Sequence, residues 1–345
     1  MANRSPNCFD TRRLLRMVDG IPIIPFDAVT PRNHPTAMIR VQDLRIDYDD
    51  ICAVDDVSVE IQAGEVYGLI GPNGAGKTST IRALVGLLEP TYGEIEICGI
   101  DVREHPQEAA REIGFMPDFP PMYDDLLVWE FLDLFAGSYF IPKAKRPDVI
   151  EKYLDLVGLT RKYFRLVAEL SRGMRQRLML AKTLLPDPQV LLLDEPASGM
   201  DPNGRADLKR AIRRLADEGR TVLVSSHILS EMNEFCTSIG IMEMGRLVVS
   251  GRVDEIASKV MGAGVLEIEI IHGLDEFQQI VAESDRTENF EKDGRVFEVV
   301  FDGDNNDAAE LLSLLVEAGV GVASFARRKD SLEDVFLQVG AQELS

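Results

Sequence analysis

A glycine-rich run next to a lysine and a threonine gives the strongest chemical signal in the sequence. Residues 65–88 read EVYGLIGPNGAGKTSTIRALVGLL, so an apolar run precedes the glycines and a helical pattern follows them. Glycines let backbone N–H groups close around phosphates, a lysine reaches the β- and γ-phosphates, and a hydroxyl can ligate Mg²⁺. Strand, loop and helix in this order predict a P-loop for a nucleoside triphosphate. Its residues are Gly71, Pro72, Asn73, Gly74, Ala75, Gly76, Lys77, Thr78 and Ser79.

Two carboxylates follow the apolar run VLLL at 190–193. Alone, such a pair could merely cap a following helix. After an upstream P-loop it instead predicts hydrolysis, because α/β sheets place ligand chemistry at the carboxyl ends of their strands. Asp194 would then hold Mg²⁺, and Glu195 would polarise the attacking water as the general base.

A histidine ends the third such run, TVLVSSH at 221–227. A lone histidine at a strand end is usually structural or faces solvent. Here the strand should lie in the same sheet as VLLL, so we expect His227 to reach the γ-phosphate.

Residues 171–180, SRGMRQRLML, combine a helix start with three arginines. Ser171 is a suitable N-cap, and apolar residues from Met174 to Leu185 recur at helical spacing. Cations are disfavoured in a first helical turn, but beside free N–H groups they make a good anion site. The stretch therefore predicts half of an anion site.

Strands alternating with helices from 38 to about 250 imply an α/β fold with a largely parallel, wound sheet. Its expected strands are VSVEI, EVYGLI, EIEIC, VLLLD, TVLVSS and IGIME. A mostly helical insert, about 119–170, should separate two of them. After Gly251 we expect a small α+β domain with strands VLEIEII (265–271), VFEVVFD (296–302) and VGVASFA (320–326), and helices near 274–283 and 307–318.

The composition narrows the class of protein. The 345 residues carry 58 acidic and 37 basic side chains, a net charge of −21, which argues against binding nucleic acid. The 4 cysteines include no C-x-x-C pair, so a reduced, cytosolic compartment fits best. No apolar run reaches the roughly 18 residues of a membrane helix. Residues 1–37 carry scattered arginines and prolines, and we expect either a disordered leader or an upstream start ahead of a working start at Met38.

These motifs together resemble the nucleotide-binding subunits of ATP-binding-cassette (ABC) transporters. LSRGMRQRL (170–178) resembles the signature sequence of that family, and SGMD (198–201), which contains Asp201, resembles its D-loop. His227 matches the switch histidine. Tyr48 matches the aromatic that stacks on adenine. The resemblance implies an ATPase cassette at 38–255 with a helical subdomain at about 119–170, followed by an accessory domain at 256–345.

The resemblance also implies partners. In the family, Ser171 and Gly173 would bind the γ-phosphate of ATP held by the P-loop of a second ABC subunit, so that a homodimer or heterodimer encloses two ATPs and Mg²⁺. A separate membrane permease would carry the substrate, with the insert docked onto it, so the chain would lie on the cytoplasmic face of the membrane.

Two residues depart from the family pattern. Asp118 in IGFMPDFPP stands where the Q-loop usually has Gln, and we expect it to ligate Mg²⁺ or hold a water. Arg172 replaces the first glycine of the signature, and both a surface role and a phosphate contact are open for it.

Together with SLEDVFLQV at 331–339, the residues Asp118 and Arg172 resemble one branch of the family, whose members serve the export of drugs, antibiotics or polysaccharides. The SLEDVFLQV segment could also be a plain amphipathic helix. A soluble, non-transport ABC ATPase and a regulatory ATP-binding module are the alternatives.

Overall fold

The computed structural model describes residues 37–118, 122–228, 232, 234–253, 255–256 and 264–327, together with the backbone of 17–18 and 21–22. The leader expected at 1–37 and the SLEDVFLQV segment lie almost wholly outside these residues. Within them, Met17–Val18 (β1) pairs with Ile21–Pro22 (β2). No described helix is long and apolar enough to cross a membrane.

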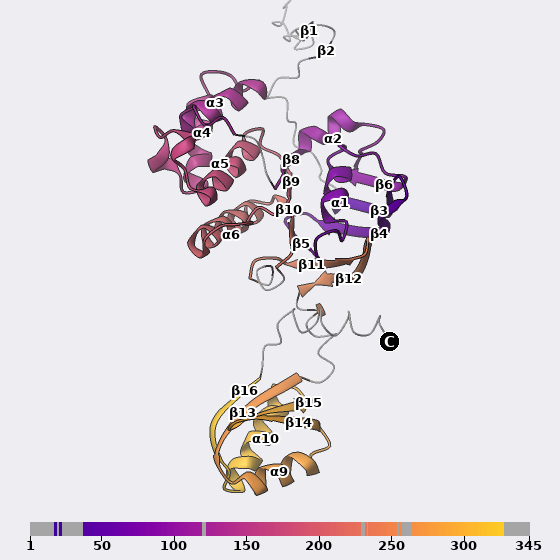
Figure 1. Cartoon of the computed structure of the whole chain (residues 1–345), viewed down its shortest axis with the longest axis vertical. Coiled ribbons are helices and arrows are strands. Elements are labelled where there is room, and N and C mark those ends of the chain that lie inside the picture. Colours follow the sequence, from indigo (N-terminus) through magenta and orange to yellow (C-terminus); the bar gives the residue numbers. More distant parts are fainter. Residues whose placement is uncertain are drawn as a thin grey trace, which may run out of the picture.

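A six-stranded sheet positions the predicted chemistry (Figure 1). Its order is β12 (Arg246–Arg252), β11 (Ser238–Glu243), β5 (Val66–Ile70), β10 (Thr221–Ser226), β9 (Val190–Leu193) and β8 (Ile113–Met116). All neighbouring pairs are parallel except β11–β12. The strands β5, β9 and β10 are buried along their whole length, as expected when both faces of a parallel sheet are covered.

A second, antiparallel sheet contains β3 (Ala37–Tyr48), β4 (Ile51–Gln62), β6 (Tyr92–Ile97) and β7 (Ile100–Asp101). The prediction that VSVEI and EIEIC belong to the parallel sheet is therefore wrong. Only two residues separate β3 from β4, and so short a connection can join only antiparallel strands.

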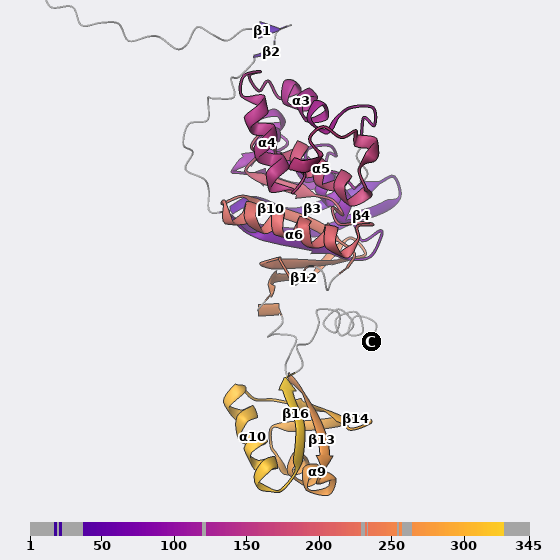
Figure 2. The ribbon, with the colours of Figure 1, turned by 90° about the vertical axis from the view of Figure 1, so that its left-hand side faces the viewer.

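The two faces of the parallel sheet have different partners, as Figures 1 and 2 show. Val66 and Ile70 face a core shared with α3 (Val128–Ser138), α4 (Arg146–Leu156), α5 (Arg172–Leu184) and α6 (Pro202–Asp217). The alternate residues Tyr67 and Leu69 face the antiparallel sheet and α1 (Lys77–Leu84). The helix α2 (Pro106–Glu112) leads into β8, and short 3-10 turns at Thr160–Lys162 and Val167–Glu169 complete the insert.

Residues 264–327 form a separate hydrophobic core. The elements run β13 (Gly264–His272), α9 (Leu274–Glu283), β14 (Thr287–Asp293), β15 (Val296–Phe301), α10 (Asn305–Glu317) and β16 (Gly321–Arg327), in the sheet order β14-β15-β13-β16. This is the split βαβ arrangement. The predicted strands and helices of this region agree with it, and β14 was not foreseen.

Candidate nucleotide site

The glycine-rich loop joins β5 to α1, and close backbone neighbours require two of its glycines. Gly76 has φ +103, and a Cβ there would lie 2.5 Å from the carbonyl oxygen of Ala53. A Cβ on Gly71 would overlap the carbonyl oxygen of Met242. Because both positions exclude side chains, the loop keeps the tight backbone curve that phosphate cradles need.

Lys77 places its ammonium group inside this loop. The Nζ donates to the carbonyl oxygens of Gly71 (2.6 Å) and Pro72 (3.1 Å) and lies 3.7 Å from Oε1 of Glu195. The side chain is 6% exposed. Burial lowers the pKa of Lys77, and the charges of Glu195 and Asp194 oppose that shift. The lysine is thus held as a buried cation facing the two carboxylates.

Asp194 and Thr78 bring a carboxylate and a hydroxyl together. Thr78 Oγ1 donates to Oδ1 of Asp194 at 3.3 Å, and Ser225 Oγ donates to the same oxygen at 2.7 Å. Mg²⁺ favours one or two carboxylates combined with substrate phosphates, so this pair fits the ion. No cluster of three or more His, Cys, Asp or Glu side chains suited to a metal occurs among the described residues.

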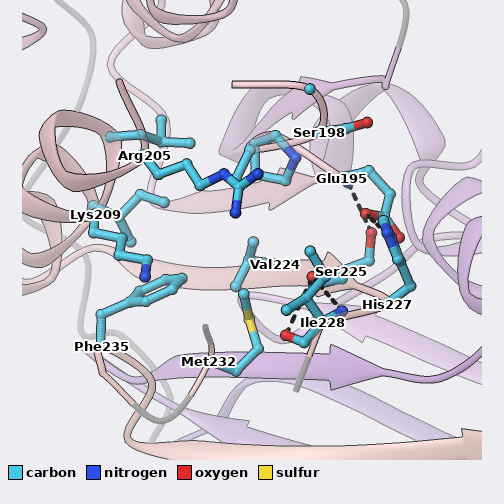
Figure 3. A pocket seen from close by; sticks show the side chains of 16 residues that line it. Glu195, Ser198, Arg205, Lys209, Val224, Ser225, His227, Ile228, Met232 and Phe235 are labelled. Carbon is cyan, nitrogen blue, oxygen red and sulfur yellow. Dashed lines mark hydrogen bonds and ion pairs between the residues drawn. The ribbon is translucent and has the colours of Figure 1, made fainter. Parts of the chain in front are cut away.

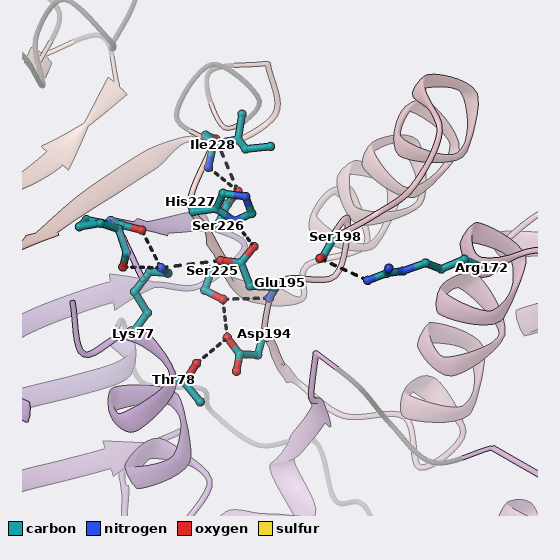
Figure 4. Close-up of polar contacts among 12 residues, drawn as sticks. Lys77, Thr78, Arg172, Asp194, Glu195, Ser198, Ser225, Ser226, His227 and Ile228 are labelled. Carbon is teal, nitrogen blue, oxygen red and sulfur yellow. Dashed lines mark hydrogen bonds and ion pairs between the residues drawn. The ribbon is translucent and has the colours of Figure 1, made fainter. Parts of the chain in front are cut away.

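Glu195 and His227 emerge from the adjacent strands β9 and β10. Nδ1 of His227 lies 2.9 Å from Oε2 of Glu195, as Figure 4 shows. The Glu195 backbone has φ +47 and donates its N–H to Ser225 Oγ at 2.9 Å. Ser225 therefore holds both carboxylate residues, a role that the sequence reasoning missed. Its only signal was a small polar residue near the end of a buried strand.

Asp118 follows β8 and faces the same centre. Burial raises the pKa of its carboxyl group, the charges of Asp194 and Glu195 raise it further, and the charge of Arg172 opposes them. Its Oδ1 is buried without a hydrogen-bond partner. Asp118 therefore brings a carboxylate oxygen without a protein partner to the edge of the sheet that also carries Asp194 and Glu195.

Tyr48 stands at the end of β3, beside the P-loop helix. Its hydroxyl lies 3.4 Å from Ser79 Oγ, and its side chain is 41% exposed. The residue is therefore partly open to solvent beside the start of α1. The tip of that loop, Pro72 to Gly74, is exposed as well.

The signature residues lie against the D-loop of their own chain. Ser171 caps α5 by accepting a hydrogen bond from the N–H of Met174 at 3.3 Å. A Cβ on Gly173 would lie 3.6 Å from both Asp201 Oδ1 and Met200 Cγ. Asp201 precedes α6. In Figure 4, Arg172 lies on the opposite side of Glu195 from Lys77, so one chain brings together the P-loop and both carboxylates but not the signature.

A cavity of about 170 Å³ lies behind Glu195 (Figure 3). Residues 195–199 line one side, α6 another, and the end of β10 a third. Its wall is largely apolar, with Arg205 and Lys209 at the α6 side. The stretch that carries Glu195 therefore borders open space on this side.

Two family models match the chain. The model described as "ABC transporter" matches residues 54–198. The model described as "ATP-binding protein DrrA1-3-like, C-terminal domain" matches residues 251–339.

Curated relatives and solved structures agree with these models. A Nod factor export ATP-binding protein I of Cupriavidus metallidurans is 31% identical over 90% of this chain and 99% of its own length. The bacitracin transport ATP-binding protein BcrA of Bacillus licheniformis is 35% identical over 88% of this chain and 97% of its own length. The solved structure of an ATP binding subunit of an ABC transporter is 32% identical to this chain, with a TM-score of 0.58, and the match covers 64% of this chain and 92% of the other.

Proposed function

The chain belongs to the ATP-binding subunits of ABC transporters, and on that premise we propose that Glu195 is the general base of its ATP hydrolysis. The observation that supports this is the position of Glu195 between Lys77, at 3.7 Å, and His227, at 2.9 Å. One partner belongs to the phosphate loop and the other to the neighbouring strand. A carboxylate so held can accept a proton from a water aimed at the γ-phosphate.

The remaining groups would position the reactants. Lys77 exchanges its bonds to the loop carbonyls for the β- and γ-phosphate oxygens. His227 contacts the γ-phosphate and orients Glu195. Thr78 and Asp194 would hold Mg²⁺, which would supply positive charge next to the phosphates. Asp118 holds a water or contacts that ion, and Tyr48 stacks on adenine.

A second ABC subunit would complete each site. Ser171 is exposed at the N-terminus of α5, where backbone N–H groups and the helix dipole favour an anion. Because Ser171 and Gly173 lie away from Lys77 in their own chain, we propose that they bind the γ-phosphate of ATP held by the partner. Two subunits, identical or different, would then enclose two ATPs.

Membership of the family implies export through a separate membrane permease. We further propose where the subunit lies at the membrane and where its domains begin and end. The subunit would sit on the cytoplasmic face of the membrane through that permease, which selects the substrate. The cassette would span 38–255, with the helical insert as the permease contact, and 256–345 would be an accessory domain.

Co-purification and ATPase assay test these proposals. The tagged chain, isolated from membranes, should retain a multi-span membrane protein and hydrolyse ATP in the presence of Mg²⁺. ATP binding without hydrolysis, even in the presence of that permease, would favour the regulatory-module alternative. An active ATPase that never retains a membrane protein would favour a soluble ABC ATPase.

A further inference from the structure

Arg172 occupies the first position of α5, immediately after its N-cap Ser171. A cation at this end of a helix is opposed by the helix dipole. Its head group reaches the D-loop of its own chain. Figure 4 shows it extended toward Ser198 of the D-loop.

The guanidinium lies against the D-loop. Its Nη2 lies 3.5 Å from Ser198 Oγ. A Cβ on Gly199 would lie 2.6 Å from both Nε and Nη1 of Arg172, so the head group fills the space that a side chain at 199 would need. Gly199 also has φ +67, a conformation that suits glycine. Arg172 and Gly199 are therefore complementary in shape.

The D-loop is in turn connected to Glu195. The N–H of Ser198 donates to the carbonyl oxygen of Glu195 at 3.0 Å. From the other side, Nε of Arg205 on α6 donates to the carbonyl oxygen of Met200 at 3.1 Å. Residues 195–199 also border the cavity of Figure 3, so packing supports this turn on only part of its surface. The arginines on α5 and α6 thus hold a turn that would otherwise have room to shift.

We propose that Arg172 is a positioning residue, which clamps Ser198 and Gly199 to the signature helix and so fixes the turn that carries Glu195. The inference rests on the proposed role of Glu195 as the general base. It assigns Arg172 a contact within its own chain rather than one with phosphate. A displacement of the α5 N-terminus, where the partner's ATP would bind, reaches Glu195 of the same chain through this clamp.

The test compares variants in the complete transporter, using steady-state ATP hydrolysis. Arg172→Ala should lower kcat about fivefold or more and leave KM for ATP within about twofold, because the lost contact orients the base rather than the nucleotide. Arg172→Lys keeps a cationic donor but loses the planar guanidinium that fills the space next to Gly199, so its kcat should lie between those of Arg172→Ala and the wild type.

Gly199→Ala supplies the second arm of the test. The added methyl would displace the guanidinium, so this variant should reproduce the loss in kcat, and the double variant should be no worse than either single one. Gly219→Ala is the matched control, because Gly219 has φ +93 with nothing within 4 Å of its Cβ. It should leave kcat unchanged.

Hydrogen exchange over residues 195–201 gives a readout independent of turnover. Exchange should be faster in Arg172→Ala and Gly199→Ala, intermediate in Arg172→Lys and unchanged in Gly219→Ala. A rise in KM with additive effects of Arg172→Ala and Gly199→Ala would overturn the clamp in favour of a phosphate contact. Unchanged kcat, KM and exchange in Arg172→Ala would overturn it in favour of a surface role. A wild-type transporter without ATPase activity would instead refute the proposed function itself.

Discussion

Nδ1 of His227 lies 2.9 Å from Oε2 of Glu195 although 32 positions separate the two residues in the chain. Their strands β10 and β9 are parallel neighbours, with Val224 opposite Leu193, so both strands end at the same edge of the sheet. Ser225 joins the two exits by accepting from the N–H of Glu195. The position of the proposed base therefore depends on strand register as well as on the loop chemistry.

Glu195→Gln should abolish turnover and retain ATP binding. The amide has nearly the shape of the carboxylate but cannot accept the proton of the attacking water, so we expect kcat to fall by about 100-fold or more. The ATP dissociation constant should stay within about threefold, because the P-loop contacts remain. With ATP and Mg²⁺ the variant should accumulate as a dimer in size-exclusion chromatography.

Glu218→Gln provides the control for that experiment, since Glu218 lies at the far end of α6 from the site. It should hydrolyse ATP at the wild-type rate. If the Glu195→Gln variant hydrolyses ATP at the normal rate, Glu195 is not the general base. A variant that remains monomeric with ATP and Mg²⁺ would count against the two-subunit site.

Tyr48→Ala should weaken ATP binding by about tenfold, because stacking of a base on an aromatic ring contributes about 1–3 kcal/mol. Tyr48→Phe keeps the ring and loses only the long hydroxyl contact with Ser79, so it should bind ATP nearly as well as the wild type. Titration with a fluorescent ATP analogue measures both. Tyr92→Ala removes another exposed tyrosine of the same sheet and should have no effect. Equal affinity of the alanine and phenylalanine variants at Tyr48 would disprove stacking.

The contrast between the two sheets shows what the sequence could and could not predict. The prediction that VLLL and TVLVSS lie in one sheet is confirmed, because buried parallel strands have continuous apolar runs and a common carboxyl edge. The strand β3 was missed and VSVEI was assigned to the wrong sheet. Asp43, with φ +49, accompanies a register shift in the β3–β4 pair that interrupts regular alternation. The residue pattern of a strand also does not reveal which other strand it pairs with in the sheet.

Arg172 shows a second limit. Its position in the signature left both a surface role and a phosphate contact open. The contact with Gly199 depends on how α5 packs against the turn after β9, and no spacing within either motif contains that information. Ser225 was missed for the same reason: its hydroxyl becomes important only through the register of β9 and β10.

Asp118→Ala should lower ATPase activity and raise the Mg²⁺ concentration needed for half-maximal rate. The carboxylate has an oxygen without a hydrogen-bond partner and lies close enough to Asp194 and Glu195 for their charges to raise its pKa, after the effect of burial. Its removal therefore takes away one contact for a cation or a water. Titration of the rate with Mg²⁺ measures the effect.

Asp125→Ala is the comparison for Asp118, because Asp125 is exposed on the loop that leads to α3. It should behave as the wild type. If activity and the Mg²⁺ dependence of Asp118→Ala are both unchanged, Asp118 has no part in the site.

A polar contact between the helical insert and the sheet core sets a prediction about stability. Asp187 Oδ1 accepts from Tyr153 of α4 at 2.9 Å and from the buried Arg220, just before β10, at 2.5 Å. Burial alone would raise the pKa of Asp187, but the hydrogen bond and charge of Arg220 outweigh it and lower that pKa below the ordinary 3.8. The side chain of Asp187 is 51% exposed, so solvent screening limits the contribution of the pair.

Asp187→Asn should lower the melting temperature of the cassette by a few degrees at pH 7, which corresponds to about 1 kcal/mol or less after screening. Because the folded pKa is depressed, this stabilisation is complete above the unfolded pKa and is lost as the pH falls through the folded value. The wild type and the variant should therefore differ at pH 7 and converge once the pH has fallen below the depressed folded pKa of Asp187. Thermal unfolding followed by the fluorescence of Trp129, the only tryptophan, measures this directly within the insert. A difference that stays constant down to pH 2 would show that the lost stability comes from packing and not from the charge of Asp187.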